Sequence, residues 1–278
     1  GAVPVLFLVQ YKNVVGVGLL ACTVAALAYI GWFMVARCNR VERERMGLIM
    51  VLTFGAVVFF TLFEQAGTSL NLFASRNIDL MGISAAETQS FNAGFILILA
   101  PVLAALWAWL AARGRDPNPT LKFGFGLIQV GLGFLVVVWA QGLADGQFRM
   151  PLFMLGLLYL LHTTGELFLS PVGISEVTKL SVKSIVSFMM AVWFLASSIA
   201  QFVGGEIAGL MGSETVGGQV LDPQLALKTS LHGFNQLGWA GVGCGVAFLV
   251  ASVFIKGWSN GANDAAGHAQ PEPADPRG

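Results

Sequence analysis

Four ionisable side chains lie inside long apolar stretches of this 278-residue sequence. They are three carboxylates and one histidine, namely Glu64, Glu166, Glu206 and His162. An ionisable group at the centre of a membrane helix costs about 3 kcal/mol even on lenient insertion scales, and such residues typically mark pathways for protons, ions or substrates. A carboxylate in that setting is suited to binding a cationic group or to carrying a proton. These four residues are therefore the first candidates for chemistry.

Glu166 has the most informative neighbours of the four. Residues four apart share a helix face, so the spacing allows His162 and Glu166 to meet. Pro171 removes a backbone donor, and Gly165 and Gly173 weaken the same stretch, so we expect this helix to bend close to the carboxylate. We interpret Glu166 as functional rather than as a glutamate satisfied by neighbouring hydroxyls. For His162 we favour a packed histidine on a helix face.

Glu64 and Glu206 lie nearer the ends of their apolar stretches. Glu64 precedes several polar residues, so it marks either the solvated end of a span or a cavity near the outer surface, and we favour the cavity. For Glu206 we favour solvation at the membrane interface. Composition alone does not select Asn92 or Trp193, because an asparagine at the start of a span is more often a cap and a tryptophan within one more often packs.

The elements that carry these residues are long and apolar. Of the sequence, 56% is hydrophobic and 11% charged, against about 25% charged residues in a typical soluble domain. The charges cluster between segments of roughly 20 residues, the length that crosses a hydrocarbon core about 30 Å thick. We therefore predict an all-α integral membrane protein with about seven transmembrane helices. The expected spans are residues 13–36, 46–72, 90–112, 120–141, 150–173, 184–211 and 232–258.

Lysine and arginine are distributed unevenly between the two sides of these spans. One side has Arg37, Arg40, Arg43, Arg45, Arg113, Arg115, Lys122, Lys179, Lys183 and Lys256. The other has Lys12, Arg76, Arg149 and Lys228. The positive-inside rule makes the first side cytoplasmic. The tail, residues 259–278, then lies in the cytoplasm, and its polar, Pro- and Gly-rich composition predicts disorder.

Several function classes find no support in the sequence. The formal net charge is zero, so nothing indicates a nucleic-acid partner. No CxxC pair or His/Cys cluster has metal-binding spacing, so no metal or other cofactor is expected. His162 and Ser170 are two helical turns apart, too far for a nucleophile–base pair, and an enzyme is not expected. Because the sequence begins with Gly1 rather than with methionine, we expect a fragment or a processed half of a longer protein.

A series of motifs follows in one order along the chain. They are FFTLFEQAGTSL at 59–70, FN at 91–92, FI at 95–96, AP at 100–101 before Trp107, KFG at 122–124, GL at 126–127, GLGF at 131–134, GELFLSPVGIS at 165–175, TKL at 178–180 and MMAVWFLA at 189–196. In order and spacing they resemble the second six-helix bundle of the proton-dependent oligopeptide transporter (POT/PTR) family of the major facilitator superfamily. The resemblance covers residues 46–258, and its most specific motif is that at 165–175.

The resemblance implies a twelve-helix fold with a central cavity between two bundles and alternating access driven by inward proton movement. Residues 46–258 are then the C-terminal six-helix bundle. The first span resembles the second helix of a hairpin that bacterial members insert between their bundles, so residues 1–45 are expected to hold that helix and a basic cytoplasmic linker. The N-terminal bundle, with its ExxER motif and the cations for a peptide carboxylate, is absent from this sequence, so the chain alone is not expected to transport.

The resemblance also implies roles for single residues. Glu166 and Asn92 match residues that hold the amino terminus of a peptide, and the family's counterpart of Glu166 couples to a gate lysine. Glu64 matches a glutamate of proton coupling and of the extracellular gate. Trp193 and Ser197, one turn apart, match residues that line the substrate pocket.

Phe60 stands where many bacterial members have tryptophan, and this difference changes the pocket wall. We expect a proton-coupled symporter of di- and tripeptides in the cytoplasmic membrane, energised by the proton gradient without a cofactor. Its expected partners are peptides, protons, the lipid bilayer and the N-terminal bundle. Two alternatives stay open. One is a related transporter of nitrate or a drug-like solute, and the other is a non-transporting membrane subunit, in which neutralising Glu64 and Glu166 changes nothing or stabilises the protein.

Overall fold

The computed structural model describes residues 12–211, 215–216, 219–220 and 222–262. Within them, seven helical segments are long and apolar enough to cross a membrane, which confirms the predicted fold class. The long helices are α2 (Lys12–Ala36), α3 (Arg40–Phe63), α5 (Ser90–Ala112), α6 (Pro119–Trp139), α7 (Leu152–Leu180), α8 (Val186–Leu210) and α9 (Pro223–Ile255). The short elements are η1 (Glu64–Gly67), α4 (Ser69–Asn77), β1 (Ile78–Asp79), η2 (Glu87–Gln89), η3 (Ala140–Leu143), β2 (Met150–Pro151), η4 (Lys183–Ile185), β3 (Thr215–Val216), β4 (Gln219–Val220) and η5 (Lys256–Ser259).

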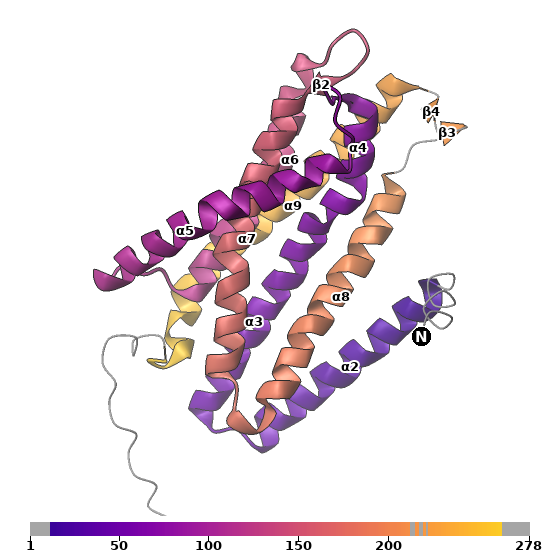
Figure 1. The fold of residues 1–278 in the computed structure, drawn as a ribbon. Coiled ribbons are helices and arrows are strands. Elements are labelled where there is room, and N and C mark those ends of the chain that lie inside the picture. The colour runs from indigo at the N-terminus through magenta and orange to yellow at the C-terminus, as the bar shows by residue number, and fades with distance from the viewer. Residues whose placement is uncertain (1–11, 212–214, 217–218, 221, 263–278) are drawn as a thin grey trace, which may run out of the picture.

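Six long helices form one bundle, namely α3, α5, α6, α7, α8 and α9. Helix α6 packs against both α7 and α9, and α3 packs chiefly against α8 (Figure 1). Helix α5 reaches the bundle mainly through α7, and α2 lies at the edge, against α8. At the top of Figure 1, β1 pairs in parallel with β2, so the segments that precede α5 and α7 meet at one end of the bundle.

The backbones of α6 and α9 touch at glycines. A Cβ atom at Gly131 would lie 2.6 Å from the carbonyl oxygen of Gly238, and one at Gly241 would lie 2.9 Å from the Cα of Gly131. Small residues allow membrane helices to approach this closely. Most glycines along these two spans are therefore packing residues, although a Cβ atom at Gly243 of α9 would meet no other atom within 4 Å. Gly205 and Gly209 of α8 differ, because a Cβ atom there would meet no other atom within 4 Å.

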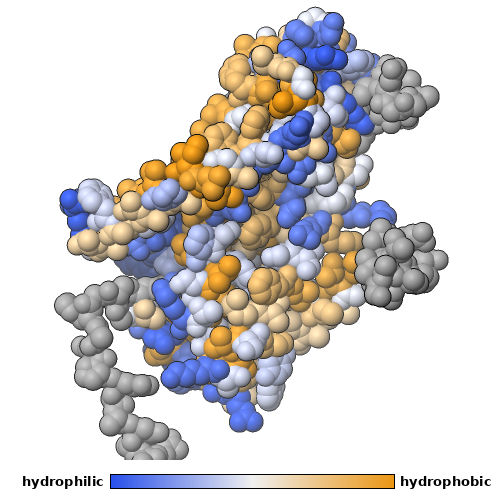
Figure 2. All heavy atoms as spheres, viewed as in Figure 1, coloured by the Kyte–Doolittle hydropathy of each residue, from blue (hydrophilic) through white to orange (hydrophobic). Residues whose placement is uncertain are grey.

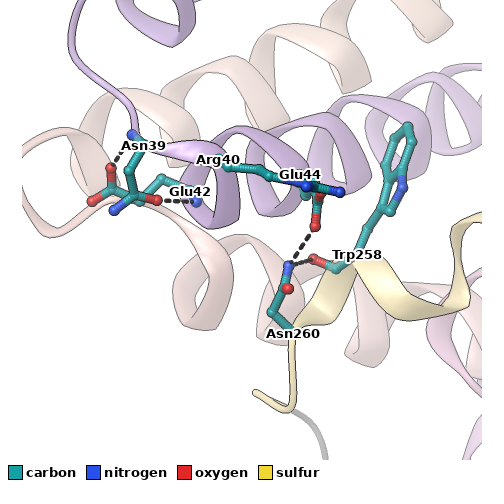
Figure 3. Close-up of polar contacts among 6 residues, drawn as sticks. All are labelled: Asn39, Arg40, Glu42, Glu44, Trp258 and Asn260. Carbon is teal, nitrogen blue, oxygen red and sulfur yellow. Dashed lines mark hydrogen bonds and ion pairs between the residues drawn. The ribbon is translucent and has the colours of Figure 1, made fainter.

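Helix α3 begins at Arg40 rather than at residue 46 as predicted. Asn39 Oδ1 accepts a hydrogen bond from the backbone N–H of Glu42 at 2.9 Å, and Glu42 Oε2 accepts one from the backbone N–H of Asn39 at 2.9 Å (Figure 3). This capping box satisfies two donors that a helix start leaves without partners. Residues 40–45, which we expected to belong to a linker, are therefore the first turns of α3.

The last described turn is hydrogen-bonded to the start of α3. Arg45 Nε and Nη2 donate to the carbonyl oxygens of Ser259 and Asn260, both at 3.2 Å. Asn260 Nδ2 donates to Glu44 Oε2 at 3.1 Å (Figure 3). The predicted start of a disordered tail at residue 259 therefore falls inside an ordered turn. The rest of the predicted tail, residues 263–278, lies outside the described residues.

Two spans are longer than predicted. Helix α7 continues past residue 173 to Leu180 with Pro171 in its interior, and the predicted bend stays a prediction. Helix α9 begins at Pro223 rather than near residue 232. Asp222 Oδ1 accepts a hydrogen bond from the backbone N–H of Leu225 at 3.0 Å, and a proline fits the first turn of a helix, so this start is well capped.

Helix α5 is the least covered of the bundle helices. None of its residues is buried by the described part of the chain, and the side chain surfaces of Leu97 and Ile98 are 80% and 65% exposed. Figure 2 shows hydrophobic side chains along this helix and hydrophilic ones at its free end. The helix thus presents a continuous apolar surface for lipid or for further protein.

Candidate functional site

Asn92 of α5 and Glu166 of α7 meet between their helices, and we call them the amide–carboxylate pair. Asn92 Nδ2 donates to Glu166 Oε2 at 3.2 Å and to Thr163 Oγ1 at 3.0 Å. The Thr163 hydroxyl donates in turn to the carbonyl oxygen of Tyr159 at 2.7 Å, so its lone pairs are available to Asn92. Glu166 is half-buried, and within the described chain its second oxygen, Oε1, accepts no hydrogen bond.

This arrangement fixes the carboxylate without neutralising it. A neutral amide orients one oxygen of Glu166, and no lysine or arginine pairs with it among the described residues. An ionised carboxylate with a free oxygen accepts charge-assisted hydrogen bonds from an ammonium group. The pair is therefore equipped to bind a cationic amine.

Glu64 lies where α3 ends and the turn η1 begins. Its Oε1 accepts a hydrogen bond from Gln201 Nε2 of α8 at 3.5 Å, at the long limit for such a bond. The span predicted at residues 46–72 is therefore interrupted at this carboxylate, since α3 ends at Phe63 and α4 follows the turn. Helix α3, which ends beside Glu64, packs against α7, which carries Glu166, and we call the two carboxylates and their partners the polar region.

The three predicted pocket residues lie on α3 and α8. Trp193 is buried, and its ring fills the space where a Cβ atom at Gly173 of α7 would collide with it. Ser197 Oγ donates to the carbonyl oxygen of Trp193 within α8 at 3.5 Å, and Phe60 of α3 is half-buried. None of the three bonds to the amide–carboxylate pair in the described chain, so their place in a substrate pocket stays a prediction.

His162 faces α6 rather than Glu166. Its Nε2 lies 3.0 Å from the carbonyl oxygen of Val130, and its ring stands edge-on to Phe134 with centroids 4.8 Å apart. His162 is 1% exposed, and no hydrogen bond joins it to Glu166 in the described chain. The bond that the spacing allows is thus not formed in the described chain, because the imidazole bonds to a neighbouring helix. The interpretation of His162 as a packed histidine is confirmed.

Two other charged side chains lie apart from this polar region. Glu206 pairs with Lys12 at 3.2 Å, with side chains 49% and 70% exposed, and its predicted interfacial position stays a prediction. Lys122 at the start of α6 is buried, pairs with Asp116 at 2.8 Å and lies over the ring of Trp107 at 4.5 Å. Both ion pairs are satisfied within the chain.

The sequence analysis did not select three residues that make hydrogen bonds in or beside the polar region. Thr163 is the second acceptor for Asn92, Gln201 reaches Glu64, and Gln65 is a buried amide in the turn η1. A polar side chain within an apolar span is a signal in the sequence, because such side chains often hydrogen-bond to a neighbouring helix. Gln201 also lies one turn beyond Ser197, on the same face of α8, a spacing that was available in the sequence.

Comparison with known families and curated proteins gives a consistent result. The sequence pattern of the POT family, PTR2, matches residues 15–221. Dipeptide and tripeptide permease B of Xenorhabdus bovienii is 30% identical over 261 residues, covering 91% of this chain and 51% of that protein. Dipeptide and tripeptide permease A of Serratia proteamaculans is 35% identical over 202 residues, covering 71% of this chain and 39% of that protein. The chain thus spans about half of the length, or less, of the curated relatives it matches.

Solved structures give the same picture. A mutant of the peptide transporter POT in complex with alafosfalin superposes with a TM-score of 0.75 at 28% identity, covering 92% of this chain and 50% of that one. A POT family transporter in complex with 5-aminolevulinic acid superposes with a TM-score of 0.73 at 26% identity, covering 91% of this chain and 52% of that one. In each case the matched region is half of the longer protein.

Proposed function

The chain belongs to the POT family of membrane transporters, and on this premise we propose that it supplies the C-terminal half of a proton-coupled symporter of di- and tripeptides. In this proposal, helices α3 to α9 are the C-terminal six-helix bundle and α2 is the second helix of an inter-bundle hairpin. A preceding six-helix bundle completes the twelve-helix transporter. The relatives named as dipeptide and tripeptide permeases support the substrate class.

The observation that carries the proposal is the hydrogen bond from Asn92 Nδ2 to Glu166 Oε2 at 3.2 Å. It directs a half-buried carboxylate whose other oxygen is free. Every di- and tripeptide carries an α-ammonium group, so a fixed anion recognises peptides of any sequence by a charge-assisted bond. Trp193, Ser197 and Phe60 are the proposed residues of the surrounding pocket.

Glu64 is the proposed proton-coupling residue. It lies at the end of α3, is half-buried and has one long bond to Gln201 of α8. Ionisable side chains in such positions typically face a cavity and mark proton relays. Its place at a helix end, next to a change in backbone geometry, suits a residue that also belongs to an extracellular gate.

The proposed setting is the cytoplasmic membrane. The basic loops predict that the connection between α2 and α3 faces the cytoplasm, as does the end of α9. The proton gradient supplies the energy, so no cofactor is required, and the substrate crosses the membrane chemically unchanged. The transporter is thus not an enzyme.

The test uses the full-length protein reconstituted in liposomes. Uptake of labelled dialanine is followed under an inward proton gradient for wild type, Glu166→Gln and the control Glu206→Gln. We expect gradient-dependent uptake in wild type and in the control, and its loss in Glu166→Gln although that variant stays folded. Uptake that survives Glu166→Gln contradicts the role of this carboxylate. A folded wild type that takes up no dialanine contradicts the peptide substrate.

A second substrate class is favoured by one comparison. The matched transporter bound to 5-aminolevulinic acid holds a small compound that, like a peptide, has an amino group and a carboxylic acid. Glu166 is equally suited to the amine of such a compound. Competition by 5-aminolevulinic acid against labelled dialanine distinguishes a site that requires a peptide bond from one that requires only the two charged groups.

A further inference from the structure

The backbone changes its hydrogen-bonding pattern at Glu64. Helix α3 ends at Phe63, and the 3-10 turn η1 follows. At its end, Thr68 has φ −125° and ψ −99°, outside the helical region, before α4 begins. The last carbonyl groups of a helix lack intrahelical donors, and inside a membrane each of them needs another partner. The carbonyl of Thr61, within the last turn of α3, is one of them.

Gln65 supplies that partner and also reaches the next helix. Its side chain is fully buried, and its Nε2 donates to the carbonyl oxygen of Thr61 at 3.1 Å and to that of Gly204 in α8 at 3.1 Å. Its Oε1 accepts a hydrogen bond from Ser69 Oγ at 2.6 Å. Both N–H donors of the amide are therefore used. One side chain thus joins the end of α3, the start of α4 and the C-terminal third of α8.

The approach of α8 depends on Gly204. A Cβ atom there would lie 3.3 Å from Gln65 Nε2 and 3.4 Å from the carbonyl oxygen of Thr61. The first distance is tighter than an ordinary van der Waals contact, so the turn would have to shift to accommodate a methyl group. Small residues at this point let the amide reach the backbone of the facing helix.

The neighbouring contact between the same helices is of another kind. Gln201, one turn before Gly204 on α8, donates to Glu64 at 3.5 Å, and Gln201 is exposed. A hydrogen bond of that length in an exposed place contributes little, whereas a buried amide left without partners is strongly unfavourable. Gln65, rather than Glu64, therefore holds α3 against α8.

We propose that Gln65 is a positioning residue for Glu64. Its two donated hydrogen bonds fix the turn η1 to α8, so the Glu64 carboxylate keeps its place while its own contacts stay free to change. The proposal rests on the proposed role of Glu64 in proton coupling. Gln65 touches neither the amide–carboxylate pair nor, on this view, the peptide.

The first measurement is a distance between spin labels in the full-length protein. Labels are attached to cysteines introduced at Leu72 of α4 and Gly205 of α8, which are exposed, in a background without the native cysteines. We expect one narrow distance distribution in wild type and a broad one in Gln65→Met, which keeps the length of the side chain and removes both donors. Gln65→Glu, which keeps the shape but removes the donors when ionised, is expected to behave in the same way.

The second measurement separates positioning from binding. In proton-driven dialanine uptake, Gln65→Met is expected to lower kcat about tenfold, a barrier change of roughly 1.4 kcal/mol, and to leave KM within about twofold. Ser69→Ala keeps both donated bonds and is expected to keep the narrow distribution. Gln236→Leu, at an exposed glutamine of α9, is the matched control for the substitution itself.

The outcomes distinguish this proposal from the proposed function. A folded Gln65→Met protein with an unchanged distance distribution overturns the positioning role, whatever its uptake. A raised KM with unchanged kcat overturns it as well. If Gln65→Met does not fold, Gly204→Ala tests the same junction from α8, and an unchanged distribution there contradicts the proposal. If wild type takes up no peptide, transport fails as a function, and the distances alone still decide the role of Gln65.

Discussion

Glu166 and Glu64 belong to one polar region but lie in different backbone settings. Glu166 is inside α7, which stays helical on both sides of it, and an amide from α5 fixes one of its oxygens at 3.2 Å. Glu64 lies at the end of α3, and its bond to Gln201 of α8 is longer, at 3.5 Å. In the second case the short buried bonds belong to the adjacent residue, Gln65.

The difference between the two backbone settings fits two functional roles. A residue that recognises a ligand needs a fixed geometry, because an oriented acceptor loses less entropy on binding. A residue that changes partners during a cycle needs weak bonds of its own and a firmly held backbone. The amide–carboxylate pair has the first arrangement, and the turn η1 has the second. Four predictions test whether this contrast is functional.

The largest effect is expected from exchanging each carboxylate for its amide. Glu166→Gln is expected to lower proton-driven dialanine uptake more than about 100-fold, or roughly 2.7 kcal/mol, because the anion for the peptide amine is lost. Glu64→Gln is expected to abolish proton-driven uptake but to keep dialanine binding, because it changes coupling alone. Binding of dialanine to the purified full-length variants is measured by calorimetry beside uptake. If Glu64→Gln loses binding as strongly as Glu166→Gln, the contrast between the two sites is broken.

A smaller effect is expected from removing the orienting amide. Asn92→Ala leaves Glu166 charged but unfixed, and hydrogen bonds to charged groups contribute about 1.5–3 kcal/mol. We expect the dialanine KM to rise at least about tenfold, with proton coupling intact. Initial uptake rates over a range of dialanine concentrations provide the measurement. An unchanged KM would mean that the amide–carboxylate pair does not act as a unit.

A third change weakens the same pair indirectly. Thr163→Val keeps the shape of the side chain but removes the acceptor that holds Asn92 at 3.0 Å. A neutral hydrogen bond contributes roughly 0.5–1.5 kcal/mol, so a rise in KM of about threefold is expected. Thr164→Val, at a half-buried threonine that bonds only within its own helix among the described residues, is the control. Equal effects of the two variants would mean that Thr163 acts through its bond within α7 and not through Asn92.

The smallest effect is expected at the C-terminal end of α8. Glu206 and Lys12 form an exposed ion pair, and such pairs contribute about 0–1 kcal/mol. Glu206→Gln is expected to leave uptake unchanged and to alter the melting temperature by no more than a degree or so. Thermal unfolding in detergent checks this expectation. A large loss of stability would show that α8 is held at this exposed pair as well as at Gln65.

Sequence patterns predicted the helices better than their ends. The span at residues 90–112 agrees with α5 at both ends, because polar residues flank a continuous apolar run. The start of α3 was misplaced because Asn39 and Glu42 form a capping box whose charged helical turns look like a linker. Within the span predicted at residues 46–72, α3 ends at Phe63, and Gln65 satisfies the freed carbonyl of Thr61 through its side chain. Hydropathy does not report such bonds.

The site was predictable only in part, for a related reason. The cost of an ionisable group in hydrocarbon selected Glu166 and Glu64, and the family motif selected Asn92. Helical spacing suggested His162 as the partner of Glu166, yet the imidazole bonds to Val130 of α6. Spacing within one helix gives neighbours on that helix only. The contacts of Asn92 with Thr163 and of Gln201 with Glu64 join different helices, and they required the packed bundle.

The glycine contact between α6 and α9 has a consequence for the order in which the bundle opens. Amide hydrogens exchange with solvent when local structure unfolds, and the slowest belong to the segments that separate last. Gly131 and Gly241 bring two backbones together with no side chain between them, so neither helix opens without exposing the other. We therefore expect the amides near these glycines to exchange more slowly than those elsewhere in the described helices.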